Sequence, residues 1–267
     1  IGVAGSQEQR DEWLPKFASG ELLGAFGLTE PLSGSDTAQG LQTVAKRDGD
    51  NWIINGAKRW IGNGSISDVT IIWARDEEDN QVKGFIVPTS TPGYSATRIE
   101  NKMALRIVQN ADIVLENVVV PEANRLQKSQ SFRETAAVLR LTRAEVAWAA
   151  VGNSIGAYEA AVQYANDRIQ FGKPIGSHQL VQEHLAKSLG NITASIGMVT
   201  RVSEMLDEGV QKDEHAALAR STRRAACARP WRGAASSWVA TASFSTTASC
   251  VTSPTRKRST PTRELAR

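Results

Sequence analysis

The segment FGLTEPLSGSD, residues 26–36, brings hydroxyl side chains and glycines together within a few positions. Gly34 has no Cβ, so another molecule can approach the backbone closely there. Thr29 and Ser35 each offer a hydroxyl that can donate and accept hydrogen bonds. The same residue types also form ordinary turns, in which Thr29 caps the chain and Ser35 with Asp36 closes a turn. Taken alone, the segment is compatible with a ligand-contacting loop and with a plain turn.

Short apolar runs after this segment predict the strands of a β-domain. A turn at DGD, residues 48–50, separates TVA at 43–45 from WII at 52–54, which is a hairpin signal. Later apolar runs, rich in β-branched residues, occupy residues 69–74, 85–87 and 113–115. Several short strands at this spacing predict an antiparallel β-barrel or sandwich.

The residues after about 130 have a helical pattern. From residue 134 to residue 166 there is no proline, and apolar residues recur at helical spacing. The break GKP, residues 172–174, precedes a second apolar stripe, for which Ser177 is the predicted N-cap. Two antiparallel helices of about 30 residues predict part of a helical bundle. The fold class is therefore α+β, with a central β-domain followed by an incomplete bundle.

Composition and charge exclude several classes of protein. The chain has 267 residues, of which 41% are hydrophobic and 22% charged, and this suits one or two ordinary domains with a core. No apolar run is long enough for a membrane helix. Residues 221–267 hold nine Lys and Arg against the single acid Glu264, so the basic balance comes from this segment rather than from a nucleic-acid-binding face. Cys227 and Cys250 make no disulfide framework, which favours a reducing cytoplasm. His178 and His184 lack further ligands, so no metal site is expected.

Three further motifs follow the opening segment in order. They are NGAKRWIGN at residues 55–63, NVVVP at 117–121, and DRIQFGKPI at 167–175 with HQL at 178–180. Together with residues 26–36 they resemble the acyl-CoA dehydrogenases, most closely the glutaryl-CoA dehydrogenase branch. The resemblance covers nearly all of residues 7–220. It implies an FAD enzyme that desaturates an acyl-CoA thioester between its α and β carbons, with glutaryl-CoA or a short-chain acyl-CoA as substrate.

The resemblance also implies a division into domains. Residues 1–21 would be the remnant of an N-terminal helical domain that is otherwise missing. Residues 22–130 would form the β-barrel domain that binds flavin and acyl-CoA. Residues 131–220 would be a partial C-terminal helical bundle, and residues 221–267 an out-of-frame or disordered segment.

Five residues of the β-domain are implied to contact the flavin ring: Phe26, Leu28, Thr29, Trp60 and Ile61. Hydride transfer to N5 leaves negative charge near N1 and O2 of the flavin, and backbone N–H groups with a hydroxyl can stabilise that charge. Leu28 and Thr29 match the family residues in this role, and Trp60 would cover one flavin face. The plain alternative for Trp60 is an ordinary core position.

A second group of residues is implied to reach the FAD of a neighbouring subunit: Arg168, Gln170, Phe171 and Gln179. The guanidinium fork of Arg168 suits a pyrophosphate, although a solvated helix end is the plain alternative.

The substrate-binding residues implied by the resemblance are Gly34, Ser35 and Arg143. For Arg143, a salt bridge to Glu145 is an alternative role.

The family further implies partners. These are an acyl-CoA substrate, a homotetramer, and an electron acceptor that is either an electron-transfer flavoprotein or oxygen, with no nucleic acid and no membrane. Two other readings stay open at this point: a non-catalytic fragment, and a flavin monooxygenase or oxidase on the same fold.

No catalytic residue is assigned, because the family's base, a Glu in a Tyr-Glu-Gly-Thr loop, is absent from this reading frame. Residues 237–246 and 257–264, read one base out of frame, permit Gly-Gly-Asn-Gly-Ile-Leu-Leu-Asp-Tyr and Ala-Leu-Tyr-Thr-Tyr-Glu-Gly-Thr, which are family motifs in order. We therefore expect a frameshift near residue 221 and little activity of the chain as printed, and Glu264 is not given the role of base. Sequencing the gene across the codons for residues 216–225 tests this expectation, and an intact frame there would contradict it.

Overall fold

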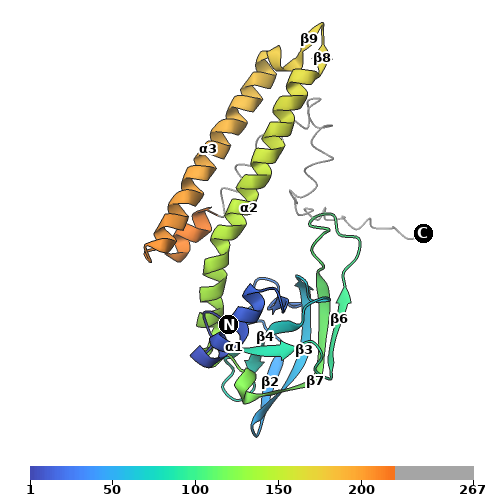
Figure 1. Cartoon of the computed structure of the whole chain (residues 1–267), viewed down its shortest axis with the longest axis vertical. Helices are drawn as coiled ribbons and strands as arrows, with labels where there is room; N and C mark the ends of the chain where they lie inside the picture. The colour runs from blue at the N-terminus through green and yellow to red at the C-terminus, as the bar shows by residue number, and fades with distance from the viewer. Residues whose placement is uncertain (220–267) are drawn as a thin grey trace, which may run out of the picture.

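The computed structural model describes residues 1–219, without the side chains of residues 143 and 144. It consists of a β-domain and a long pair of helices that rises from it (Figure 1). The segment 221–267, for which a shifted frame is predicted, lies outside the described residues.

Seven strands form the sheet of the β-domain. They are β1 (Gly24–Gly27), β2 (Val44–Asp48), β3 (Asn51–Ile61), β4 (Val69–Asp76), β5 (Val82–Pro88), β6 (Tyr94–Arg98) and β7 (Ala111–Pro121). The strand order is β1-β4-β2-β3-β7-β6, with β5 paired to β4. The predicted hairpin is present, since β2 and β3 pair across a turn in which Gly49 has a φ of 57°.

The pairing is antiparallel for β2–β3, β3–β7, β4–β5 and β6–β7, as expected. The pairs β1–β4 and β2–β4 are instead parallel. Parallel neighbours need a crossover connection rather than a tight turn. The crossover from β1 to its partner β4 is residues 28–68, which include β2 and β3. It begins with the segment 28–43, which carries most of the opening motif. The sheet therefore displays this loop at the end of β1.

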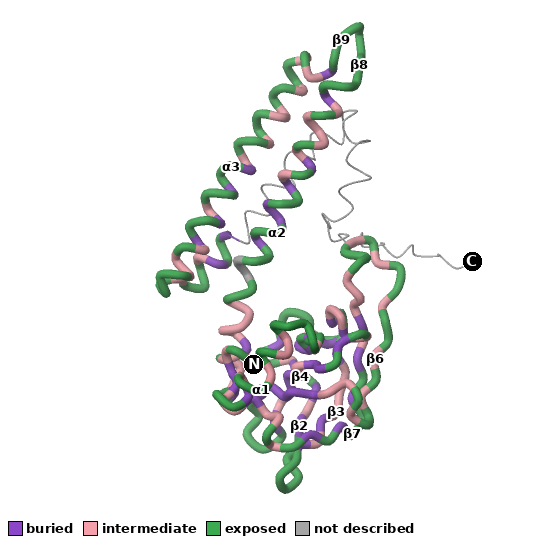
Figure 2. The backbone as a smooth tube through the Cα atoms, viewed as in Figure 1, coloured by how far each residue is buried: buried purple, intermediate pink, exposed green. Residues whose placement is uncertain are grey.

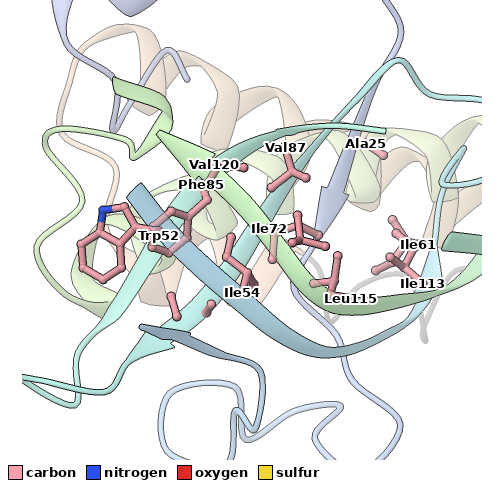
Figure 3. Close-up of a cluster of buried hydrophobic side chains, with 13 residues drawn as sticks. Ala25, Trp52, Ile54, Ile61, Ile72, Phe85, Val87, Ile113, Leu115 and Val120 are labelled. Atoms are coloured by element: carbon pink, nitrogen blue, oxygen red, sulfur yellow. The ribbon is translucent and has the colours of Figure 1, made fainter. Parts of the chain in front are cut away.

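The core lies on both faces of the central strands. One cluster fills the curl of the sheet and includes Trp52, Ile72 and Phe85 (Figure 3). A second cluster, around Trp73 and Ile86, is covered in part by Trp13 and Phe17 of helix α1 (Gln7–Ala18). Strands β4 and β5 are buried on both faces, so their sequences are mostly apolar throughout and do not alternate between apolar and polar residues.

Helix α2 (Phe132–Asp167) begins with a capping box in which Ser131 and Glu134 bond each other's backbone. This start agrees with the helical region predicted from about residue 131. After α2 come the short strands β8 (Ile169–Gln170) and β9 (Lys173–Pro174), and then helix α3 (Gln179–Asp207).

The N-cap of α3 is His178 and not Ser177 as predicted. Ser177 ends the short helix η2 (Ile175–Ser177), where its hydroxyl donates to the Pro174 carbonyl at 2.8 Å. The hydroxyl is therefore already used by the preceding turn.

Helices α2 and α3 run side by side in opposite directions (Figure 1). Their contact is made by small and branched residues, among them Ala147, Val151, Val199 and Val202. Buried residues gather in the β-domain, whereas much of the helical pair is exposed in the described part of the chain (Figure 2). None of the helices within residues 1–219 is both long and apolar enough to cross a lipid bilayer.

Candidate functional site

The loop after β1 is fixed from inside the domain by the buried carboxylate of Glu30. One carboxylate oxygen accepts the backbone N–H of Gln42 at 2.7 Å, and the other accepts that of Thr43 at 2.9 Å. The Glu30 N–H donates to the Ser33 carbonyl at 3.0 Å. One acidic side chain therefore ties the start of the loop to its end.

Lys58 of β3 completes this arrangement. Its Nζ lies 2.8 Å from Glu30 Oε1, 2.6 Å from the Trp73 carbonyl oxygen and 3.2 Å from the Leu28 carbonyl oxygen. An ammonium has three N–H donors, and three acceptors surround this one. Its side chain has no exposed surface, and that of Glu30 has 3%. The pair is therefore a dry, fully satisfied ion pair.

Both members of this pair are charged at neutral pH. Burial lowers the pKa of the Lys58 ammonium to about 8, against the opposing effect of Glu30. Burial alone would raise the pKa of the Glu30 carboxyl, but the charge of Lys58 and the hydrogen bonds from Lys58, Thr43 and Gln42 outweigh it and leave this pKa below its usual value. The lowered pKa of Lys58 still lies above 7 and the pKa of Glu30 lies below its usual value, so both groups are ionised at pH 7.

Thr29 lies beside the end of β3. Its carbonyl accepts the N–H of Arg59 at 2.8 Å. No described group accepts a hydrogen bond from the Thr29 N–H or pairs with its hydroxyl. The Thr29 donors are therefore available to a molecule outside the protein.

Trp60 follows Arg59 directly and is 52% exposed. Its φ is 63°, and it falls in an irregularity of the β3–β7 pairing between Lys58 and Ile61. A bulge re-aims a side chain, and here the indole leaves the core. The Trp60 carbonyl accepts from the side-chain amide of Asn110 at 2.9 Å, which fixes this irregular backbone. Trp60 is therefore not an ordinary core residue, which was the alternative to a flavin-contacting role.

The structure brings the other β-domain candidates close to these two. Leu28 and Ile61 are buried next to Thr29 and Trp60 in sequence. Phe26 is partly exposed on β1, with its ring 6.0 Å from that of Trp73. Gly34 and Ser35 lie in the exposed loop that follows.

The second group of candidates lies elsewhere. Arg168 ends α2, Gln170 lies on β8, and Gln179 begins α3, all of them exposed. Phe171, at the turn between β8 and β9, is 93% exposed and has its ring 6.0 Å from that of His178. Figure 1 shows this hairpin at the end of the helical pair farthest from the β-domain.

The two groups cannot meet within one chain. The first turns of α2 pack on the β-domain through Phe132 and Leu139. The helix has 36 residues, which corresponds to roughly 54 Å at about 1.5 Å per residue. Arg143 lies in α2 between these ends, and its side chain is outside the described part. A ligand that touches both groups would therefore need two copies of the chain.

Sequence reasoning missed Lys58 and Glu30 as site residues. The signal was present in β3, where Trp52, Ile54 and Lys58 share one parity and all three are buried. A lysine on the inward face of a strand requires a buried partner. The acid of the opening motif is the partner that the structure provides.

Two family models match the chain: the middle domain of acyl-CoA dehydrogenases over residues 25–118 and their C-terminal domain over residues 132–237. A probable acyl-CoA dehydrogenase of Bacillus subtilis is 39% identical over 221 residues, which are 81% of this chain and 58% of the relative. The chain thus spans little more than half the length of that relative.

Solved structures agree with this relationship. A glutaryl-CoA dehydrogenase from Mycobacterium smegmatis superposes with a TM-score of 0.85 at 38% identity, over 91% of this chain and 62% of that chain. A second glutaryl-CoA dehydrogenase from the same organism, in complex with FADH2, has a TM-score of 0.83 at 34% identity, over 87% of this chain and 59% of that one. The chain belongs to the acyl-CoA dehydrogenase family.

The buried pair makes a prediction about stability. Replacing Lys58 with Met leaves the Glu30 carboxylate buried without its partner, so we expect the free energy of unfolding to fall by about 3–5 kcal/mol. The double variant Lys58→Met/Glu30→Gln should recover part of this loss. Urea denaturation followed by circular dichroism measures both.

The control is Lys187→Met, which removes an exposed ion pair with Glu183 on α3. No measurable change is expected there, because exposed pairs contribute little. Equal losses for the Lys58 and Lys187 variants would contradict the importance of the buried pair.

Proposed function

We propose that this chain carries the flavin- and thioester-binding part of an FAD-dependent acyl-CoA dehydrogenase. One observation carries the proposal. The N–H and hydroxyl of Thr29, which have no partner among the described residues, lie at the same end of β3 as the exposed indole of Trp60. A flat, electron-poor ring that gains negative charge would find donors at its edge and an aromatic surface on its face. The FADH2-bound relative supports FAD as that ring.

In the proposed reaction, FAD supplies the hydride acceptor when it is bound. The Thr29 N–H and hydroxyl would stabilise the negative charge that develops at the flavin edge. Trp60 would cover one face of the ring and exclude water from it. The partly exposed Phe26 would add apolar surface, and the buried side chains of Leu28 and Ile61 would support it from inside the domain.

The acyl-CoA would lie along the exposed loop of Gly34 and Ser35, where the backbone is open to close approach. Arg143 is proposed to lie near the thioester. The α-proton must be taken by a carboxylate or another base within hydrogen-bond reach. We assign no base among the described residues.

The substrate class is proposed to be a short acyl-CoA or glutaryl-CoA. The similarity to two glutaryl-CoA dehydrogenases supports this choice. The electron acceptor is proposed to be an electron-transfer flavoprotein or oxygen. At least two copies are proposed to share each flavin, because the hairpin group, with Arg168 and Phe171, lies too far from the flavin group to serve the same chain. A homotetramer is proposed from membership of the family.

The test is anaerobic mixing of the flavin-loaded chain with glutaryl-CoA or butyryl-CoA. Loss of the flavin absorbance band would support desaturation. Flavin that binds but keeps its colour would favour a monooxygenase on the same fold. A chain that takes up no flavin would favour the non-catalytic reading and would contradict the proposal.

Two substitutions distinguish the residues proposed to contact the flavin ring from the residue proposed to contact the pyrophosphate. Trp60→Ala should weaken the binding of riboflavin and of FAD alike, each by roughly tenfold, because a ring contact of about 1.5 kcal/mol is lost. Arg168→Ala should weaken FAD and leave riboflavin unchanged, because riboflavin has no pyrophosphate. Fluorescence titration at several protein concentrations measures both effects.

Matched controls are Trp148→Ala, an exposed tryptophan on α2, and Lys173→Ala, an exposed cation on the same hairpin as Arg168. Neither should change flavin affinity. A loss of riboflavin binding in Arg168→Ala would refute the division into a ring group and a pyrophosphate group.

A further inference from the structure

Three consecutive residues of β3 hold the site together. The Lys58 ammonium donates to the Leu28 carbonyl, the Arg59 N–H donates to the Thr29 carbonyl, and Trp60 turns outward. The peptide units on both sides of Thr29 are therefore bonded to the same strand. The first of these bonds comes from a full positive charge, whereas the second comes from a neutral amide.

The Leu28 carbonyl and the Thr29 N–H belong to one peptide unit. The described chain has no cis peptide bond, so these two groups point in opposite directions. Since the carbonyl points at the buried ammonium, the N–H points away from it. This is the N–H for which the described chain provides no acceptor.

A carbonyl that accepts a strong hydrogen bond makes the N–H of its own peptide a stronger donor, since chains of hydrogen bonds polarise one another. At 3.2 Å this is the longest of the three hydrogen bonds of the ammonium, but its donor is charged and shielded from water, which favours the polarisation. A neutral donor could hold the loop equally well in place. Holding the backbone in place would therefore not by itself require a charge.

We propose that Lys58 is a positioning residue for flavin chemistry: its ammonium orients and polarises the Leu28–Thr29 peptide, so that the outward N–H binds the negative charge of the reduced flavin more strongly. This inference rests on the proposed function. Glu30 has the complementary task of keeping the ammonium charged inside the domain. Lys58 itself touches neither flavin nor substrate.

The peptide can be observed directly by NMR without any flavin. Labelling the full chain with carbonyl-¹³C leucine and ¹⁵N threonine gives linked signals only from Leu–Thr bonds. The sequence contains two of these, Leu28–Thr29 and Leu141–Thr142. The second lies on α2 and serves as the reference within the same sample.

Between pH 6.5 and 8.5 we expect the Leu28–Thr29 signal to move with a midpoint near 8, where the Lys58 ammonium titrates. The Leu141–Thr142 signal should stay constant. Glu30 is the only charged side chain that contacts this ammonium among the described residues, and it remains ionised over this range. The α-amino group of Ile1 has a lowered pKa, so the double variant Lys58→Met/Glu30→Gln must abolish the movement if Lys58 is its source.

Lys83→Met is the matched control, because Lys83 is a largely buried lysine that pairs with Asp76 and not with the loop. It should leave the movement unchanged. A Leu28–Thr29 signal that ignores pH, or that still moves in the double variant, would overturn the proposal. Neither result would depend on flavin binding, and wild-type flavin affinity would report on the proposed function separately.

The second arm measures the flavin itself. In the flavin-loaded chain the double variant should have a more negative reduction potential than the wild type, while Lys83→Met should not. A purely structural role for Lys58 would lower flavin affinity without moving the potential. An unchanged potential, or a wild-type chain that binds no flavin although its peptide signal titrates, would remove the assignment of Lys58 to flavin.

Discussion

The buried contact between Lys58 and Glu30 is the constraint on which the β-domain site depends. Two oppositely charged groups without water are tolerated only when every proton and lone pair has a partner. Here the requirement draws together β3, β4, the end of β1 and the loop that follows it. The geometry of Thr29 and the outward turn of Trp60 follow from where these backbones are held.

The length of α2 is the second constraint. A helix of 36 residues separates the loop around Thr29 from the hairpin around Phe171. The β-domain offers a surface suited to a ring, and the hairpin offers a guanidinium and an exposed aromatic side chain. If both groups contact one cofactor, as proposed, at least two copies of the chain must contribute to each site.

The sequence predicted much of this, for reasons that can be named. The α+β class and the two long helices followed from periodicity, because strands and helices repeat at different spacings. The parallel pairing of β1 and β2 with β4 could not be read, because it depends on a crossover rather than on a local turn. His178 replaced Ser177 as N-cap because the serine hydroxyl was already bonded to the preceding turn.

Within the candidate site, the family resemblance pointed to Thr29 and Trp60, but it did not reveal the residues that support them. Lys58 and Glu30 are 28 positions apart, and their contact exists only once the sheet has formed. Motif matching also could not reveal that the Thr29 N–H has no acceptor within residues 1–219, because this depends on where every neighbouring acceptor points.

Phe171 occupies a left-handed backbone conformation, with a φ of 53°, in the tight turn between β8 and β9. Glycine or asparagine is the comfortable residue there, and a bulky aromatic ring costs on the order of 1 kcal/mol or more. Glycine at this position would relieve the backbone strain but would remove the projecting ring. A substitution chosen for stability at the tip of the hairpin would therefore delete the side chain proposed to reach a neighbouring flavin.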